Sequence, residues 1–143
     1  MKRTQSVEDY LEAILMVQQE KGFCRAIDIA QHLGFSKPSV SVALRNLENA
    51  DAVIRTNDGD VQLTDKGLAI ATSVLDRHRF LTGFLVYLGV DPEIAEEDAC
   101  GMEHALSPQS FKRFREWFEK VRAAEPVCGE LTPLERLSES ETI

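Results

Sequence analysis

The chain has 143 residues, of which 43% are hydrophobic and 28% are charged, which is the composition of an ordinary globular protein. No apolar run approaches the roughly 18 residues that a membrane span requires, and no signal-peptide pattern stands near the N-terminus. The three cysteines, Cys24, Cys100 and Cys128, are too few for a disulfide framework. We therefore expect a protein of the reducing cytoplasm with no membrane partner.

The net charge of −8 argues against a uniformly basic surface for nucleic acid. Residues 1–70 carry 8 basic and 10 acidic side chains, whereas residues 71–143 carry 8 and 14. The acidity therefore lies mainly in the second half of the chain. A bound divalent metal would offset part of this charge and would reduce the repulsion of phosphate.

The chain begins with a predicted amphipathic helix over residues 6–22. Ser6 and Asp9 resemble a capping box at its start, and Gly22 is a plausible stop. A shorter helix is predicted over 26–33. The apolar residues of these two helices that we expect to face inward are Tyr10, Leu11, Ile14, Leu15, Val17, Ile27, Ile29, Ala30 and Leu33.

A tight turn at Gly34 leads into a third predicted helix over 37–49. Pro38 stands in its first turn, where a missing N–H has no cost, and Val40, Leu44 and Leu47 recur at the spacing of a buried face. Two short helices joined through glycine, the second with an exposed polar face, are typical of a helix-turn-helix.

A β-hairpin is predicted next, with strands over 53–56 and 61–64 around an Asp-Gly turn. A hairpin placed directly after a recognition helix is a wing. Thr64 then caps a long helix that ends near Gly89.

Two further helices are predicted, over 92–106 and from residue 108, each with proline at its first position. We expect a mostly α protein with a small β wing and three parts. These are a winged helix-turn-helix domain (1–70), a helical domain (71–126) and a flexible tail (127–143).

The third helix presents a polar outer surface suited to DNA. Lys37 and Arg45 can reach phosphates, and Ser39 and Ser41 can contact phosphate or base edges. Either Pro38 or Val42 could touch a thymine methyl group. Two further residues suit backbone contacts, namely Arg25 before the second helix and Arg55 on the wing. A single module of this size has a small footprint, so we expect a symmetric dimer on a palindromic site.

Cys100, Glu103 and His104 stand at i, i+3 and i+4, which places a thiol, a carboxylate and an imidazole on one helix face. These are three of the side-chain types that bind first-row transition metals. Matching donors occur at Asp9 and Glu12 on the first helix and at His78 on the long helix. Taken singly, each has a plainer explanation, such as a solvated helix face or a small buried cysteine.

The order and spacing of several short motifs resemble the diphtheria-toxin-repressor and manganese-transport-regulator family of metal-dependent transcriptional repressors. The resemblance extends from about residue 6 to residue 118. The motifs that carry it are Val7-Glu8-Asp9-Tyr10-Leu11-Glu12, Ser39-Val40-Ser41, Leu63-Thr64-Asp65-Lys66-Gly67, Arg77-His78-Arg79 and Glu103-His104-Ala105-Leu106-Ser107.

This resemblance implies a dimer with a winged-helix domain and a helical metal-binding and dimerisation domain. It places the metal ligands on Asp9, Glu12, His78, Cys100, Glu103 and His104. Asp9 is typical of the manganese branch, whereas Cys100 is typical of the iron branch, so the implied cofactor is Fe(II) or Mn(II). Glu96 is a possible extra ligand, and Thr82 stands where iron-type members carry glutamate.

Three further interpretations concern these residues or the aromatic residues of the same half. The first is a winged-helix sensor of thiol oxidation that uses Cys100 or Cys24 without metal, although acidic neighbours disfavour a reactive thiolate at Cys100. The second is an enzyme, but no nucleophile–base arrangement accompanies the site, so we expect none. The third concerns the aromatic residues of the helical half, which we interpret as a dimer interface although a packed core is the ordinary outcome.

Overall fold

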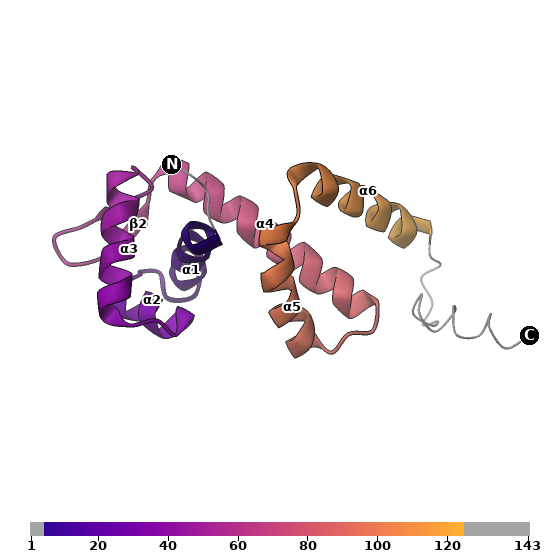
Figure 1. Cartoon of the computed structure of the whole chain (residues 1–143), viewed down its shortest axis with the longest axis horizontal. Helices are drawn as coiled ribbons and strands as arrows, with labels where there is room; N and C mark the ends of the chain where they lie inside the picture. Colours follow the sequence, from indigo (N-terminus) through magenta and orange to yellow (C-terminus); the bar gives the residue numbers. More distant parts are fainter. Residues whose placement is uncertain (1–4, 125–143) are drawn as a thin grey trace, which may run out of the picture. The chain divides into compact units, whose positions relative to one another are not determined.

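A computed structural model describes residues 5–124, which form six helices and one two-stranded antiparallel sheet (Figure 1). The fold class expected from the sequence, mostly α with a small β wing, is confirmed. The described residues divide into two compact units between Leu75 and Asp76. The elements are α1 (Gln5–Lys21), α2 (Ala26–Leu33), α3 (Lys37–Asn49), β1 (Val53–Arg55), β2 (Val61–Leu63), α4 (Asp65–Tyr87), α5 (Pro92–Ala105) and α6 (Pro108–Ala124).

The helix boundaries of the first unit follow from capping chemistry. Gly22 and Gly34 both adopt positive φ, 80° and 70°, and terminate α1 and α2. Ser36 caps α3, since its Oγ accepts a hydrogen bond from the backbone N–H of Ser39 at 3.3 Å. Ser6 lies inside α1 rather than before it, so the expected capping box at Ser6 is wrong.

The core of the first unit is built from α1, α2, α3, the hairpin and the beginning of α4. Val40, Leu44 and Leu47 form the buried face of α3, as their spacing predicts. One inward assignment is wrong, because Ile27 is 41% exposed. It lies in the first turn of α2, where only Ile29 and Ala30 are fully buried.

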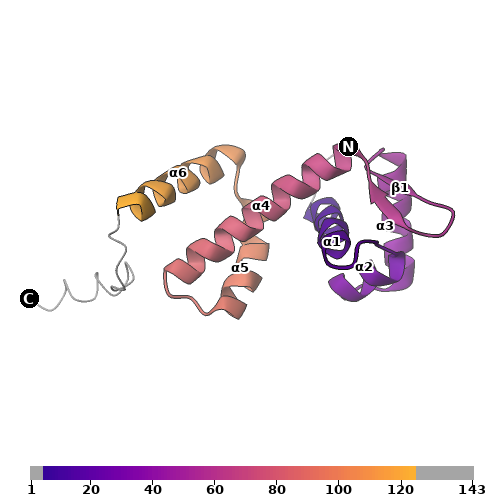
Figure 2. The same cartoon turned by 180° about the vertical axis from the view of Figure 1, so that it is seen from behind.

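The predicted wing is present as a hairpin after α3 (Figure 2). In its register Val53 lies opposite Leu63 and Arg55 opposite Val61. The residues at the start of β2 are joined to the loop before α2 by two hydrogen bonds. The N–H of Val61 donates to the carbonyl of Cys24 at 2.6 Å, and the N–H of Cys24 donates to Asp60 Oδ1 at 2.9 Å. The base of the wing is therefore fixed to the rest of the unit.

A close backbone approach fixes the start of α4. A Cβ atom at Gly67 would lie 2.0 Å from the carbonyl oxygen of Ala52, so only glycine fits there. Thr64 caps the helix, as predicted, because its Oγ1 accepts a hydrogen bond from the N–H of Gly67 at 3.1 Å.

The second unit consists of the later part of α4 with α5 and α6. Leu81, Ala99 and Phe111, one from each helix, form its buried centre. Asp91 caps α5 and Ser107 caps α6, each by accepting a hydrogen bond from a backbone N–H of the first turn. The tail predicted over 127–143 lies outside the described residues.

Aromatic rings and arginines interleave in this unit. Phe84 packs edge-on against Phe118 with ring centroids 5.2 Å apart, and Phe80 packs in the same way against Phe111 at 5.4 Å. The guanidinium of Arg115 lies about 5 Å from two ring centroids and pairs with Asp76 at 2.8 Å. Of the aromatic residues interpreted above as a dimer interface, Phe84, Phe111 and Phe118 are buried in this unit, whereas Phe114 and Trp117 are exposed. Within residues 5–124, no helix combines the length and the apolar character that crossing a membrane requires.

Candidate metal centre and DNA-reading surface

A buried carboxylate lies between two imidazoles in the second unit. Glu103, on α5, is 1% exposed. Its Oε2 lies 2.9 Å from Nδ1 of His78, and its Oε1 lies 3.2 Å from Nε2 of His104. Because burial of an unpaired carboxylate is costly, Glu103 requires hydrogen-bond or cationic partners.

The geometry of this cluster suits a cation. Oε1 of Glu103 accepts no hydrogen bond from any of residues 5–124, although it is buried. Such a buried lone pair is satisfied when it coordinates a metal ion. The nitrogen and oxygen donors within reach are of the types that divalent first-row metals bind, so the residues present fit such an ion.

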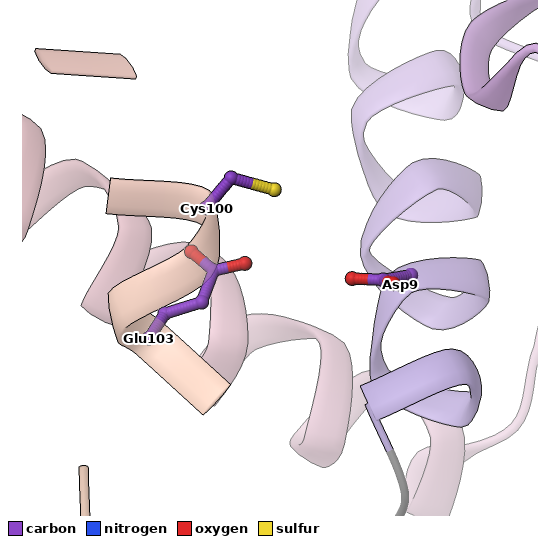
Figure 3. Close-up of side chains that lie close together, drawn as sticks. All are labelled: Asp9, Cys100 and Glu103. Carbon is purple, nitrogen blue, oxygen red and sulfur yellow. The ribbon is translucent and has the colours of Figure 1, made fainter. Parts of the chain in front are cut away.

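Cys100 stands one turn before Glu103 on α5. Its side chain is exposed, and Figure 3 shows it projecting from the same side of the helix as Glu103. Glu96 lies one turn earlier and is 66% exposed, with Oε1 4.0 Å from Nε2 of His78. The structure thus brings His78, Glu103 and His104 into contact and leaves Glu96 at the edge of the cluster.

The remaining two predicted ligands belong to the first unit. Asp9 and Glu12 lie three residues apart on α1, which places them on one face of that helix. Figure 3 shows the Asp9 side chain projecting from α1. Asp9 is half-buried and Glu12 is buried.

Arg77 is a further residue of the centre for which the sequence analysis named no function. Its guanidinium donates hydrogen bonds to the carbonyls of Glu103 and Leu106, at 2.9 and 3.1 Å. These carbonyls belong to the C-terminal turn of α5, which has no intrahelical donors of its own. Arg77 therefore holds in place the turn that carries Glu103 and His104. Its position beside His78 in the Arg77-His78-Arg79 motif was the available signal.

Thr82 does not extend the cluster. Its Oγ1 donates a hydrogen bond to the carbonyl of His78 at 2.8 Å, within α4. This bond uses the hydroxyl locally and steadies the turn that carries the imidazole.

The outer surface of α3 is exposed as the DNA-reading prediction requires. The exposed residues of its first three turns are Lys37, Pro38, Ser39, Ser41, Val42, Arg45 and Asn46. The hydroxyls of Ser36 and Ser39 are hydrogen-bonded to each other at 2.9 Å. Ser39 is therefore partly engaged in capping the helix.

Arg25 and Arg55 are both exposed, but each interacts with a neighbour. The guanidinium of Arg25 lies 5.9 Å from the ring centroid of Phe23, and that of Arg55 pairs with Glu48. The wing tip is acidic. A hydrogen bond from the Thr56 hydroxyl holds the pKa of Asp58 below its usual range. The wing thus presents negative charge beside Arg55.

The two cysteines of the described residues differ sharply. Cys24 is fully buried, and burial raises the pKa of its thiol from 9.0 to about 12. A thiol that stays protonated at neutral pH is a poor nucleophile, so Cys24 is unsuited to sensing oxidants. Cys100 is exposed and stands beside the metal-type donors.

Comparison with known proteins gives matches over most of the chain. Residues 2–61 match the family described as "Iron dependent repressor, N-terminal DNA binding domain", and residues 64–125 match its "metal binding and dimerisation domain". A transcriptional regulator MntR of Escherichia coli O6:H1 is 36% identical over 118 residues, which are 82% of this chain and 76% of that protein. An MntR of Bacillus velezensis is 34% identical over 137 residues, 96% of each chain.

A solved structure described as that of the manganese regulator SloR has a similar fold. It superposes with a TM-score of 0.70 at 27% identity. The match covers 83% of this chain and 55% of the SloR chain, so the chain spans about half the length of that protein.

Proposed function

Because the chain belongs to the iron-dependent repressor family that includes the MntR regulators, and is a metal-dependent transcriptional repressor and not an enzyme, we propose a specific set of metal ligands for it. The set is Asp9, Glu12, His78, Cys100, Glu103 and His104, with Glu96 as a possible extra ligand, and the metal is Fe(II) or Mn(II). The observation that carries the proposal is the buried carboxylate of Glu103 between two imidazoles.

The donor set explains why two metals remain in question. Carboxylates such as Asp9 and Glu12 suit Mn(II), while the thiolate of Cys100 favours Fe(II) and softer ions. Metal binding also requires neutral imidazoles and a deprotonated thiol, so we expect affinity to fall in acid as protons compete for these side chains.

The DNA-contacting residues that we propose are Arg25, Lys37, Pro38, Ser39, Ser41, Arg45 and Arg55. The family's DNA-binding and dimerisation domains imply a homodimer that binds double-stranded DNA. We propose that its operator is palindromic, because a two-fold symmetric dimer presents two equivalent recognition helices. The division into 1–70, 71–126 and a tail over 127–143, and a cytoplasmic location, complete the proposal.

Regulation follows if metal binding and DNA binding are coupled. A cation bound by the proposed ligands neutralises the carboxylates of Asp9, Glu12 and Glu103. Carboxylates from the DNA-binding domain and donors from the helical domain are then held together, which favours one arrangement of the two. A shift from mostly inactive to mostly active dimer requires a differential affinity of about 5 kcal/mol. By reciprocity, operator DNA should tighten metal binding.

The test is an anaerobic DNA-binding titration of the full chain, first without metal and then with Mn(II), Fe(II), Zn(II) and Co(II). The operator is obtained by in vitro selection from random duplexes. We expect affinity to rise at least about tenfold with Mn(II) or Fe(II), and Glu103→Gln should abolish this rise. Glu97→Gln, an exposed acid on the same helix, is the matched control. Equal affinity with and without every metal would refute the proposal.

A narrower experiment addresses metal preference. Replacement of the thiolate by a carboxylate in Cys100→Glu should move the ranking of DNA activation towards Mn(II). An unchanged ranking would mean that Cys100 does not set selectivity.

A further inference from the structure

The outward face of α3 carries one exposed apolar side chain that the proposed contacts leave unused. Val42 is 53% exposed in the middle of α3. Ser39 lies one turn before it and Arg45 one turn after it, and both are exposed. A single exposed valine is common on protein surfaces, so its exposure indicates a function only through its location.

Val42 lies on the exposed face of α3, the helix that corresponds to the recognition helix of the DNA-binding domain. A recognition helix enters the major groove with its N-terminal residues against the base edges, and Val42 is the sixth residue of α3. The buried face of the same helix is occupied by Val40, Leu44 and Leu47, so Val42 has no role in the core. Its methyl groups therefore lie on a surface whose neighbouring exposed side chains include the hydroxyls of Ser39 and Ser41 and the guanidinium of Arg45.

The major groove offers one apolar group among its hydrogen-bonding edges, which is the C5 methyl of thymine. Valine carries no donor or acceptor and cannot read any other base feature. It is also stiff, since a β-branched side chain in a helix adopts one dominant χ1 rotamer. Its methyl groups are thus held in one direction before DNA arrives, which favours discrimination.

We propose that Val42 is a specificity-determining residue that packs against a thymine methyl in each half of the operator. The inference rests on the DNA-binding function and adds to the contacts proposed above. Burial of about one methylene equivalent corresponds to a three- to fivefold change in affinity for each thymine methyl. Two symmetric half-sites would together give about tenfold or more.

The experiment compares thymine with deoxyuridine, which lacks only the methyl group. The operator is selected with the wild-type dimer and the activating metal, and each thymine is then replaced singly by deoxyuridine. We expect one thymine position per half-site where this replacement weakens wild-type binding about three- to fivefold. The same replacement should leave the affinity of Val42→Ala unchanged.

Two controls separate the possible failures. Leu68→Ala removes a similarly exposed apolar side chain outside the recognition helix and should keep the full deoxyuridine penalty. Thermal unfolding monitored by circular dichroism verifies that Val42→Ala is folded, as expected for an exposed position where alanine is the better helix former.

Failure of the wild-type dimer to bind any selected duplex would overturn the proposed function itself. Binding with no deoxyuridine penalty at any position, or with a penalty that persists in Val42→Ala, would overturn only the assignment of Val42.

Discussion

At the scale of single residues, burial decides which cysteine thiol is accessible for chemistry. Cys24 is enclosed by the core of the first unit, and its backbone N–H and carbonyl anchor the wing. Cys100 is exposed on α5. Burial thus gives these two cysteines different roles. Cys24 is unsuited to be the reactive thiol of the alternative oxidation sensor.

Cys24 should make folding stability sensitive to alkali. Its pKa in the folded state is about 12, above the ordinary 9.0, so the unfolded chain loses the proton first. The contribution of the protonated thiol to the free energy of unfolding is complete below pH 9 and is lost as the pH rises towards 12. Urea unfolding of wild type and Cys24→Ala between pH 8 and 11 measures this. The stability difference between the two should shrink above pH 9, and a constant difference would contradict the burial argument.

Arg77 should affect metal affinity without being a ligand. Arg77→Met keeps much of the side-chain length but removes the donors to the carbonyls of Glu103 and Leu106. We expect metal affinity to fall about tenfold, as for other residues that orient ligands, with partial recovery in Arg77→Lys. Competition titration with a metal indicator gives the affinities. Arg113→Met, which removes an exposed arginine of α6, should behave as wild type.

The residues of the candidate centre were predictable in part. The helical spacing of Cys100, Glu103 and His104 predicts that they share one face, because this spacing is local information. The contact of Glu103 with His78 joins residues 25 positions apart and depends on how α4 and α5 pack. Arg77 was not predictable as a positioning residue, because its partners are backbone carbonyls that leave no trace in side-chain identity.

At the level of elements, start and stop signals determined most of the architecture. Proline in the first turn of α3, α5 and α6 and glycine after α1 and α2 located these boundaries to within a residue or two. The partition of aromatic side chains was harder to foresee. In the second unit, aromatic rings pack edge-on against one another, namely those of Phe80, Phe84, Phe111 and Phe118. Helical periodicity alone does not distinguish such packing within the unit from packing at an interface.

The arginine of the wing is already paired with a carboxylate, and the tip of the wing is acidic. Arg55 interacts with Glu48, and the Thr56 hydroxyl lowers the pKa of Asp58, which is ionised at neutral pH. Both features reduce the attraction of the wing for phosphate. We therefore expect recognition to depend mainly on α3, and the hairpin to limit binding to unrelated DNA.

This role of the wing tip can be tested with Asp58→Asn. Removal of one negative charge should raise affinity for random-sequence duplex DNA about two- to threefold at low salt. The gain should vanish as added salt screens the charge. Fluorescence anisotropy over a salt series measures both effects, with Glu20→Gln on α1 as an acidic control. A gain that did not depend on salt would exclude an electrostatic cause.

At the scale of the whole molecule, the surface through which the dimerisation domain contacts a second copy of the chain has to be identified. On α6 of the second unit, Phe114 is 38% exposed and Trp117 is 54% exposed, and both touch the ring of Phe84. Large exposed aromatic side chains are the type that dominates binding energy at protein interfaces. This pair is our choice for part of the dimer contact.

The double variant Phe114→Ser with Trp117→Ser should weaken the dimer by at least about tenfold, because the lost aromatic area is no longer removed from water. Sedimentation velocity over a concentration series gives the dissociation constant. Lys112→Ser alters a more exposed residue of the same helix and should leave it unchanged. An unaltered dimer in the aromatic variant would place the contact elsewhere.

Trp117 is also the only tryptophan among the 143 residues. Its indole therefore supplies nearly all of the intrinsic fluorescence that can be excited at long wavelength, and this emission comes from one position on α6. A half-exposed indole emits towards the red and shifts towards the blue when covered. The protein consequently carries a label-free reporter, through which the state of the helical unit can be followed while metal or DNA is added.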